Sequence, residues 1–552
     1  MKQLRPYQEE SVRILASGGL NASGLGAGKT LTSVETVRHL RLGRTPRILV
    51  VAPVNTLGQW HRTFAEQYPS LETGGLLHTL GTHRKDTEGW ARLTVRRNKP
   101  SGVYLISWNA MHGGIPEDIR RRASSGQNRS RKEPKASKAA AERAIQEGTV
   151  PPWTRTGVWD LVILDEVHRA VNRQGVPRYV LKCIKADRWL GLSATPGGNS
   201  PEGLWTILNL LWPERYPSFW DWAEQHFEIE SKEYYKGGRQ EIVRKVGDEL
   251  HPGAVWNGIP AVVRYRTEEV VDQLPPVIER EVRVPLGKLQ QEQYEDFVVQ
   301  CFSWIADQPV ATPLPVEQRT RLRQAALGTL DADEAQTKST VWATERRISE
   351  LLAEKTSKVF NLVKLGPRRP HERTGETEYR ISFERVKLDV LYDEREEQPK
   401  LAALMEILND LPADEPVLVW THSAKWARMA EKAIGSSSVA WTMKTTAAKR
   451  KKIESGFGRE WRVLIAQLQS LSEGVDWLKD VCRCEVIVSP TEDNVMNEQA
   501  EGRLHRPGQT SPVQRWRLVS EGTIDDRINL DNLMKRARMG SLYRDSSEKE
   551  RT

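Results

Sequence analysis

The stretch at 21–30, NASGLGAGKT, has the residue types of a loop that binds phosphate groups. Its glycines, which let a backbone approach a ligand closely, are Gly24, Gly26 and Gly28. A helix that begins after such a loop points free backbone N–H groups at phosphate oxygens, while Lys29 reaches the terminal phosphates and the Thr30 hydroxyl ligates Mg²⁺. However, Ser23 stands where the pattern GxxxxGK[ST] requires glycine. The stretch therefore indicates a nucleotide site whose type the loop alone leaves open.

Two carboxylates, Asp165 and Glu166, end the aliphatic run DLVILDE at 160–166. At the end of a buried strand, the first carboxylate can hold Mg²⁺ beside the phosphates. The second can orient an attacking water and take its proton. An acidic pair in this place can also simply cap the next element, but the phosphate loop upstream favours hydrolysis of a terminal phosphate.

Two arginines, Arg503 and Arg506, lie in QAEGRLHR at 499–506. Residues three apart share one face of a helix, so both guanidinium groups can point at one anion. Planar, permanently charged groups of this kind stabilise the charge on a phosphoryl group during transfer. The alternative is a basic surface helix, which leaves the rest of the string, beginning with Gln499, unexplained.

Short, continuous apolar runs predict the elements that hold these residues, because strands of a parallel sheet are covered on both faces. In the first part of the chain such runs lie at 47–53, 103–107, 160–166 and 189–195. In the second part they lie at 416–422, 461–467 and 484–490, separated by helical stretches such as 425–434. We therefore expect an α/β protein with two parallel-sheet lobes.

The chain is expected to divide into lobes, insertions and a tail. The parts are a first lobe at 1–225 with a basic insertion at about 115–157, mostly helical insertions and a linker at 226–395, a second lobe at 396–535 and a polar tail at 536–552. Within the basic insertion, residues 120–147 hold nine Lys or Arg and three Asp or Glu. This segment is a solvated loop, a nucleic-acid contact, or both.

The composition excludes several classes of protein. Of 552 residues, 38% are hydrophobic and 28% are charged, which is typical of a soluble globular protein. No apolar run approaches the roughly 18 residues of a membrane-spanning helix, and the first residues lack the apolar core of a signal peptide, so we expect a cytoplasmic protein without a membrane partner. Four cysteines are too few for a disulfide framework. The net charge of +9 permits a polyanionic partner.

Taken in their order along the chain, these motifs resemble helicase superfamily two, and within it the Swi/Snf-type DNA-dependent ATPases. The first motif of that superfamily is closer to AxxGxGKT, which 23–30 fits with Ser23 for the first Ala, so the phosphate loop is intact and of the helicase kind. The stretches at 192–214 and 262–297 are similar to features of the Swi/Snf branch. The resemblance covers residues 4 to about 530. It implies two RecA-like lobes in a compact member of bacterial or phage type.

The resemblance also implies roles for individual residues. Gln8, in LRPYQEE, would recognise adenine, Gln499 would belong to the ATP site, and Thr30 and Asp165 would hold Mg²⁺. The residues expected to couple the nucleotide to DNA are His168, Ser193, Thr195, Gly474, Asp476 and His505. The stretch around Gly474 departs from the family pattern, because Glu473 stands where a small residue is usual.

The implied function is a motor that hydrolyses ATP to ADP and phosphate and moves along DNA through sequence-independent backbone contacts. Double-stranded DNA is the expected track, because strand separation needs a wedge and the 22 residues between Asp476 and Gln499 leave little space for one. A strand-separating helicase and an ATP-switched DNA-binding platform are the alternatives. Replication or recombination proteins are candidate partners, and the oligomeric state stays open. Trp420, at a predicted strand end, is a candidate for stacking on DNA bases, with core packing as the alternative.

Overall fold

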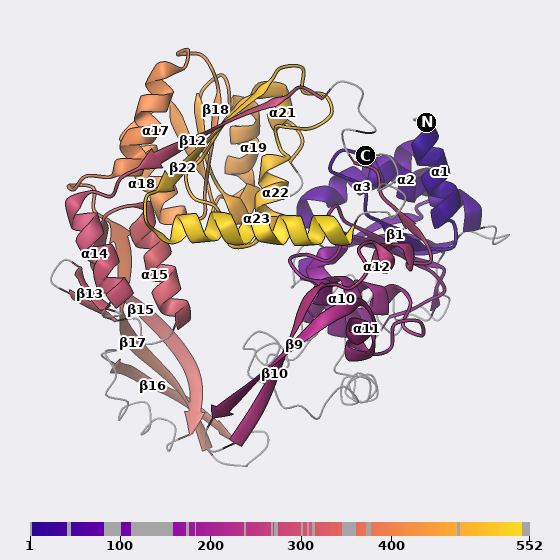
Figure 1. Cartoon of the computed structure of the whole chain (residues 1–552), viewed down its shortest axis with the longest axis horizontal. Coiled ribbons are helices and arrows are strands. Elements are labelled where there is room, and N and C mark those ends of the chain that lie inside the picture. Colours follow the sequence, from indigo (N-terminus) through magenta and orange to yellow (C-terminus); the bar gives the residue numbers. More distant parts are fainter. Residues whose placement is uncertain are drawn as a thin grey trace.

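Two parallel β-sheets with helices beside them form two lobes, and α23 (Ile524–Leu542) runs between the lobes (Figure 1). The computed structural model describes residues 3–40, 46–81, 101–111, 158–172, 176–182, 184–236, 239–266, 269, 274–299, 302–305, 308–311, 315–344, 360–370, 377–471 and 475–543. The expected α/β class with two parallel-sheet lobes is confirmed. The basic insertion at about 115–157 lies outside the described residues.

The first sheet has the strand order β11-β1-β8-β6-β2-β4-β3, and all its neighbouring strands are parallel. Its strands are β1 (Gly19–Asn21), β2 (Arg47–Ala52), β3 (Leu77–Gly81), β4 (Gly102–Ser107), β6 (Leu161–Asp165), β8 (Trp189–Leu192) and β11 (Val262–Val263). The helices of this lobe are α1 (Pro6–Leu15), α2 (Lys29–Thr36), α3 (Leu57–Gln67), α4 (Pro69–Thr73), α6 (Trp108–Met111), α9 (Val176–Lys182), α10 (Pro201–Leu211), α11 (Phe219–His226) and α12 (Ala254–Asn257). Side chains at 48–52 are fully buried on both faces, as the continuous apolar runs require.

The second sheet has the order β12-β22-β21-β18-β20-β19 and is also parallel throughout. Its strands are β12 (Val277–Val284), β18 (Val417–Thr421), β19 (Ser438–Trp441), β20 (Val463–Gln467), β21 (Cys484–Ile487) and β22 (Val513–Ser520). The helices of this lobe are α14 (Lys288–Val299), α15 (Pro315–Leu327), α17 (Pro399–Asp410), α18 (Ala424–Ile434), α19 (Ala447–Gly456), α20 (Leu468–Leu471), α21 (Leu478–Val481) and α22 (Asn494–Glu501). In both lobes the apolar runs named from the sequence are the inner strands of the sheets.

The region at 226–395 differs from the mostly helical insertions expected there. It contains the antiparallel pair β9 (Phe227–Lys236) and β10 (Arg239–Glu249), the short pair β13 (Phe302–Ile305) and β14 (Gln308–Ala311), and the antiparallel sheet of β15 (Leu330–Thr344), β16 (Phe360–Pro370) and β17 (Thr377–Tyr392). The long strands extend from the lobes as two arms (Figure 1). Apolar and polar residues alternate along β17, and this period of two, with its β-branched and aromatic residues, favours a strand over a helix.

The expected lobe boundaries also need correction. Strand β11 pairs with β1, so the first lobe continues to Val263. Strand β12 pairs with β22, so the second lobe begins at Val277, well before 396. Each sheet takes its edge strand from a segment distant in the sequence, which composition along the chain does not reveal.

We expected a polar tail at 536–552, but residues 536–542 form the end of a helix. Helix α23 continues to Leu542, and Met539, Leu542 and Tyr543 are buried in the hydrophobic core of the first lobe. At its other end, Ile524 and Ile528 pack with Ala326 in the second lobe. A helix of 19 residues spans about 28 Å. One rigid element therefore has both of its ends in a core, each in a different lobe.

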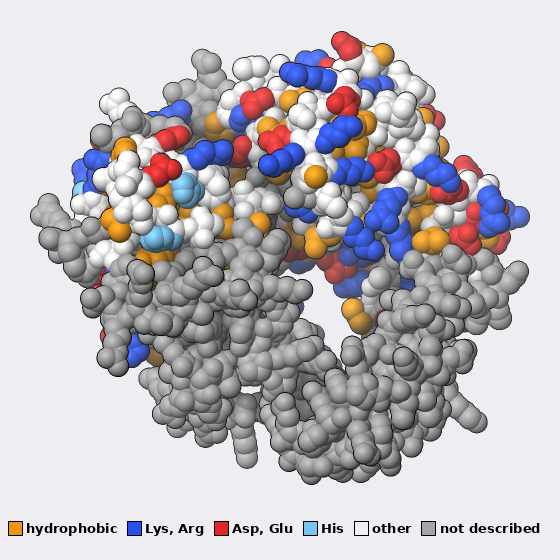
Figure 2. All heavy atoms as spheres, turned by 180° about the vertical axis from the view of Figure 1, so that it is seen from behind, with side chains coloured by type: hydrophobic (Ala, Val, Ile, Leu, Met, Phe, Trp, Pro, Cys, Tyr) orange, Lys and Arg blue, Asp and Glu red, His pale blue; other side chains and the backbone are white. Residues whose placement is uncertain are grey.

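The surface carries both signs of charge. Seen from behind, Lys and Arg side chains are spread over the second lobe among Asp and Glu side chains (Figure 2). In this view the positive charge is not gathered into a single patch. Among the described residues, no helix has the length and apolar character needed to cross a membrane.

The anchoring of α23 predicts a difference between two leucines of that helix. Leu542 is 2% exposed in the first-lobe core, whereas Leu533 is 63% exposed. We expect Leu542→Ala to lower the free energy of unfolding by about 2–5 kcal/mol, because it leaves a cavity in the core. Leu533→Ala should change it by less than about 0.5 kcal/mol. Urea denaturation followed by tryptophan fluorescence measures both, and equal effects would show that the end of α23 does not hold the lobe.

Candidate nucleotide site between the lobes

The phosphate loop lies between β1 and α2, and two of its glycines have left-handed backbone angles. Gly26 has φ 78° and Gly28 has φ 75°. A Cβ atom on Gly28 would lie 2.3 Å from Gln8 Nε2, and one on Gly26 would lie 2.5 Å from Pro507 Cδ. Both the backbone conformation and the space therefore require glycine. Pro507 belongs to the second lobe, so this loop is already in contact with that lobe.

The phosphate-loop lysine lies in an enclosed, highly charged environment. Lys29 Nζ donates hydrogen bonds to the carbonyl oxygens of Ser23 at 2.8 Å and Gly24 at 2.9 Å. Burial lowers the pKa of Lys29, the charges of Glu166 and Asp165 oppose that shift, and those of Arg506 and Arg503 add to it. Residues from both lobes therefore act on one ammonium group.

Helix α1 and the end of the first lobe hold the loop from two sides. Tyr7 Oη donates to the carbonyl of Ala27 at 3.1 Å, and Gln8 Nε2 donates to the same oxygen at 3.4 Å. Ser23 Oγ accepts the N–H of Tyr265 at 3.2 Å. The serine that departs from the glycine pattern therefore ties the loop to the chain that leaves this lobe.

Asp165 ends strand β6 and is buried beside the loop. Its Oδ2 accepts hydrogen bonds from Trp60 Nε1 at 2.9 Å and from Thr56 Oγ1 at 3.3 Å. Burial, reinforced by the neighbouring charge of Glu166, raises the pKa of Asp165 to about 6. The carboxylate is therefore ionised at neutral pH, although burial makes its charged form unfavourable. A bound cation would offset this unfavourable free energy.

Glu166 follows directly in a strained conformation. Its φ of 53° is the one positive value outside glycine in the described part of the chain. Burial alone would raise the pKa of Glu166, but the hydrogen bond and charge of His168, with the charges of Lys29 and Arg503, bring it down to about 2. Left-handed backbone at a non-glycine residue is kept mainly at functional sites. The carboxylate stays ionised at neutral pH and can orient a water.

Three residues expected to couple nucleotide and DNA form a series of polar contacts that begins at Glu166. His168 Nδ1 lies 3.3 Å from Glu166 Oε2 and 2.9 Å from Ser193 Oγ. Ser193 Oγ in turn accepts the N–H of Thr195 at 3.1 Å. The loop after β8 is thus linked to the second carboxylate. Gly197 lies four residues after Ser193 in the same loop. Its N–H donates to Tyr543 Oη at 2.9 Å, so the residue that follows α23 contacts this loop.

The two arginines lie in the turn that follows α22, and not on one helix face as expected. The helix ends at Glu501, and Gly502 is its C-cap. Arg503 Nη1 and Arg506 Nη1 both donate to the carbonyl of Val475, at 3.0 and 3.3 Å. The turn therefore brings the guanidinium groups together, although helical spacing does not apply.

This turn, residues 502–507, packs against the phosphate loop and is here called the finger loop. A Cβ on Gly502 would lie 2.3 Å from Leu25 Cδ1, and Pro507 lies against Gly26 as described above. The structure thus brings together the five expected catalytic side chains. They are Lys29, Asp165, Glu166, Arg503 and Arg506.

The remaining predicted residues lie around this centre. Asp476 forms an ion pair with Arg506, and the buried Gln499 accepts the Nε–H of Arg503 through its carbonyl at 3.2 Å. His505 Nε2 lies 2.9 Å from the carbonyl of Pro275, in the segment that connects the lobes. Gly474 lies outside the described residues. The coupling roles themselves stay predictions.

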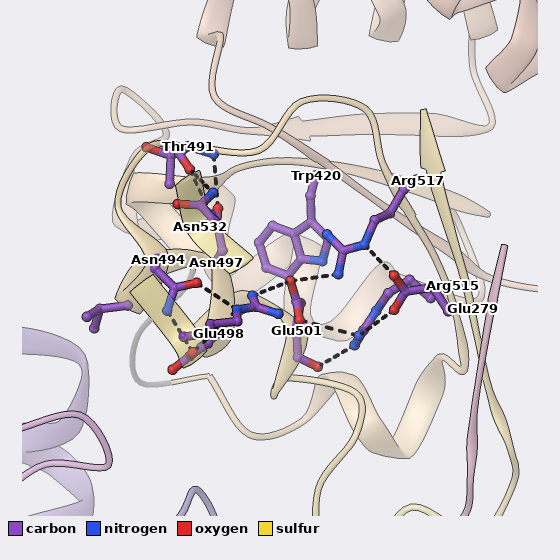
Figure 3. Close-up of polar contacts among 12 residues, drawn as sticks. Glu279, Trp420, Thr491, Asn494, Asn497, Glu498, Glu501, Arg515, Arg517 and Asn532 are labelled. Atoms are coloured by element: carbon purple, nitrogen blue, oxygen red, sulfur yellow. Dashed lines mark hydrogen bonds and ion pairs between the residues drawn. The ribbon is translucent and has the colours of Figure 1, made fainter. Parts of the chain in front are cut away.

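A network of charged and polar side chains behind the finger loop, with the buried pair Arg515 and Glu485 among them, was not expected from the sequence. Its members lie on β12, β18, β21, β22, α22 and α23, and several of them are labelled in Figure 3; they include Glu279, Trp420, Glu485, Glu498, Glu501, Arg515, Arg517 and Arg536. Glu501 accepts from Arg517 at 2.9 Å and Arg536 at 3.0 Å. Arg536 Nε also donates to Asn494 Oδ1 at 2.7 Å. Helix α22 is therefore fixed to both the sheet and α23 along its length.

Trp420 belongs to this network and is not a surface residue. It is fully buried, and its Nε1 donates to Glu485 Oε2 at 2.9 Å. The prediction that Trp420 stacks on DNA bases is therefore wrong, and the alternative of core packing is confirmed. The available sequence signal was Arg515 and Arg517, which alternate along β22 and so share one face that a covered sheet normally fills with apolar residues.

The residues fit a nucleoside triphosphate with Mg²⁺. Gly26 and Gly28 give the loop its left-handed turns, and the first N–H groups of α2, which can bind phosphate oxygens, follow directly after it. Thr30 and Asp165 offer the hard oxygen donors that Mg²⁺ prefers. Gln8 already contacts the loop from α1.

The amino-acid sequence of this chain is similar to those of known proteins. The model of a family described as "SNF2-related domain" matches residues 7–329. The ATP-dependent DNA helicase DDM1 of Arabidopsis thaliana is 25% identical over 263 residues, which cover 45% of this chain and 30% of that protein. The ISWI chromatin-remodeling complex ATPase ISW2 of Saccharomyces cerevisiae is 24% identical over 308 residues, which cover 54% of this chain and 22% of that protein. The chain thus spans less than a third of the length of these curated relatives.

A solved structure, the Sulfolobus solfataricus SWI2/SNF2 ATPase core in complex with dsDNA, is similar at 16% identity with a TM-score of 0.34. The similarity covers 97% of this chain and 92% of that chain.

Removing the charge of Asp165 and removing that of Glu166 are expected to have opposite effects on the free energy of unfolding. The pKa of Asp165 is raised from 3.8, so above pH 6 its charge destabilises the folded state. The pKa of Glu166 is lowered from 4.5, so above pH 4.5 its charge stabilises the folded state. At pH 8 we expect Asp165→Asn to raise and Glu166→Gln to lower the free energy of unfolding, each by about 1–3 kcal/mol.

Urea denaturation in the presence of a chelator measures this, so that no metal ion contributes. For Asp165→Asn the gain should disappear below about pH 4, where Asp165 is protonated in both the folded and the unfolded state. For Glu166→Gln the loss should shrink as the pH falls from 4.5 towards 2. Shifts of the same sign at pH 8 would contradict the assignment of the two carboxylates.

Proposed function

The chain belongs to the SNF2-related family, and from this premise we propose that it is a DNA-dependent ATPase that uses ATP hydrolysis to move along double-stranded DNA. The observation that carries the proposal is the contact of the finger loop with the phosphate loop. Through this contact, basic groups of one lobe reach the acidic and basic groups of the other. A site completed by two lobes can change when the lobes move, which is what a motor requires.

Each side chain has a role in hydrolysis that its position supports. Lys29 and the N–H groups at the start of α2 bind the phosphates. Glu166 orients the attacking water and accepts its proton. Arg503 and Arg506 stabilise the charge that develops on the transferred phosphoryl group. Asp165 and Thr30 would hold Mg²⁺, which would supply positive charge close to the phosphates.

Motion on DNA would follow from a change in the contact between the lobes. The polar contacts from Glu166 through His168 to Ser193 connect the site with the loop after β8. Helix α23 connects that loop with the second lobe. A nucleotide that favours the closed contact would shift the population of lobe arrangements. If each arrangement holds the DNA phosphates at different positions, repeated hydrolysis advances the protein.

The proposal is tested first by ATP hydrolysis with no nucleic acid, with single-stranded DNA, with duplex DNA and with RNA. Strong stimulation by duplex supports translocation on double-stranded DNA, and displacement of a triplex-forming strand is then the direct assay. Stimulation by single strands alone would favour strand separation. If none of them stimulates hydrolysis but nucleotide changes DNA affinity, an ATP-switched platform replaces the motor.

Two variants of the first lobe should separate hydrolysis from DNA binding. We expect Lys29→Ala and Glu166→Gln each to abolish hydrolysis, because one loses the phosphate contact and the other loses the group that orients water. DNA affinity, measured by fluorescence anisotropy, should remain, since neither side chain is proposed to touch DNA. Loss of DNA binding by a folded variant would contradict this division.

The finger loop predicts an effect on rate more than on binding. Arg506→Ala should lower kcat by about 10³ or more, as expected for a group that acts on the transition state. The affinity for ATP should change much less. Arg428, an exposed arginine on α18 of the same lobe, gives the matched control, and Arg428→Ala should leave kcat unchanged. A fall in affinity without a fall in kcat would assign Arg506 to binding alone.

A further inference from the structure

Two tryptophans bind the same aspartate from different helices. Trp60 lies on α3 and is fully buried, and its Nε1 donates to the carboxylate oxygen Oδ2 of Asp165 at 2.9 Å. Trp108 lies on α6 and is 2% exposed, and its Nε1 donates to the backbone carbonyl of Asp165 at 2.8 Å. One indole therefore holds the side chain and the other holds the backbone.

Such pairing is not common to all buried tryptophans of this chain. Within the described structure, the buried Nε1 atoms of Trp426 and Trp441 have no hydrogen-bond partner. The N–H groups of Trp60 and Trp108 therefore make contacts that core packing alone does not demand. A buried carboxylate with a neutral donor on one oxygen has fewer orientations than a carboxylate among apolar side chains.

We infer that Trp60 is a positioning residue for the metal-binding carboxylate, because its indole N–H holds Oδ2 of Asp165 and leaves the carboxylate one orientation in which to bind Mg²⁺. This inference rests on the proposed function. Thr56 Oγ1, at 3.3 Å from the same oxygen, adds a second and weaker contact. Groups that orient a metal ligand typically change metal affinity by 10- to 100-fold when removed.

A purely structural role for Trp60 is the competing explanation. Its ring packs in the first-lobe core, with a centroid 6.2 Å from that of Phe64. Trp60→Phe keeps an aromatic ring there and removes the N–H group. Trp108→Phe makes the same chemical change at a second buried site against the same aspartate, but it spares the carboxylate. The pair therefore separates loss of packing from loss of the carboxylate contact.

The experiment measures binding of a fluorescent ATP analogue to the full chain over a range of Mg²⁺ concentrations. We expect Trp60→Phe to raise the half-saturating Mg²⁺ concentration about 10- to 100-fold. Its affinity for the analogue in the presence of a chelator should stay at the wild-type value. Trp108→Phe should stay within about threefold of the wild type in both measurements, because the carboxylate contact remains.

The inference would be overturned if the two variants had the same Mg²⁺ dependence. It would also be overturned if Trp60→Phe lost as much affinity for the analogue in the presence of a chelator as it lost in the presence of Mg²⁺. If Trp60→Phe does not fold, Thr56→Val removes the other donor from a half-buried position and should shift the Mg²⁺ dependence in the same direction. No shift in a folded Thr56→Val would then count against the inference. If the wild-type chain binds the analogue without any dependence on Mg²⁺, the proposed function fails instead.

Discussion

The contact between the finger loop and the phosphate loop is the constraint on which the rest of the structure depends. Burial disfavours both charges, since it lowers the pKa of Lys29 and by itself would raise that of Glu166. The neighbouring carboxylates oppose this shift at Lys29, and the charge of Arg503 from the second lobe helps to keep Glu166 ionised. Gly26 and Gly502 lie where the two loops meet, and neither position has room for a Cβ. The charged site therefore needs both lobes at close range.

Two structures behind the site keep the loops at that range. The network around Glu501 fixes α22, and so the start of the finger loop, to β22 and α23. At the other end of α23, Tyr543 accepts a hydrogen bond from the loop after β8. Breaking a buried charged pair leaves an uncompensated charge, which is strongly destabilising. The orientation of the arginines is therefore determined well away from the place where they act.

Local patterns predicted what depends on local structure. The phosphate loop, the carboxylates after β6 and the apolar runs of both sheets follow from residue type and short spacing, and the structure places them as expected. The arms at 227–249 and 330–392 were misjudged, because their strands pair only with each other and carry charged residues at alternate positions. Trp420 was judged by its place at a strand end, whereas its burial depends on Glu485 in a strand 65 residues away. The Trp60 contact to Asp165 spans 105 residues, and nothing in either stretch predicts it.

Helix α23 restricts how the two lobes can move. A flexible linker would let the lobes separate by any amount up to its extended length, but a helix of 19 residues with a buried end in each lobe has a fixed length. Its ends can pivot, whereas stretching it would break helical hydrogen bonds or pull apolar residues out of a core. The lobes are therefore left with rotation on an arc of nearly constant radius. If the proposed motor moves along DNA, the length of α23 would then set the distance covered in one cycle, and this distance would vary little from cycle to cycle.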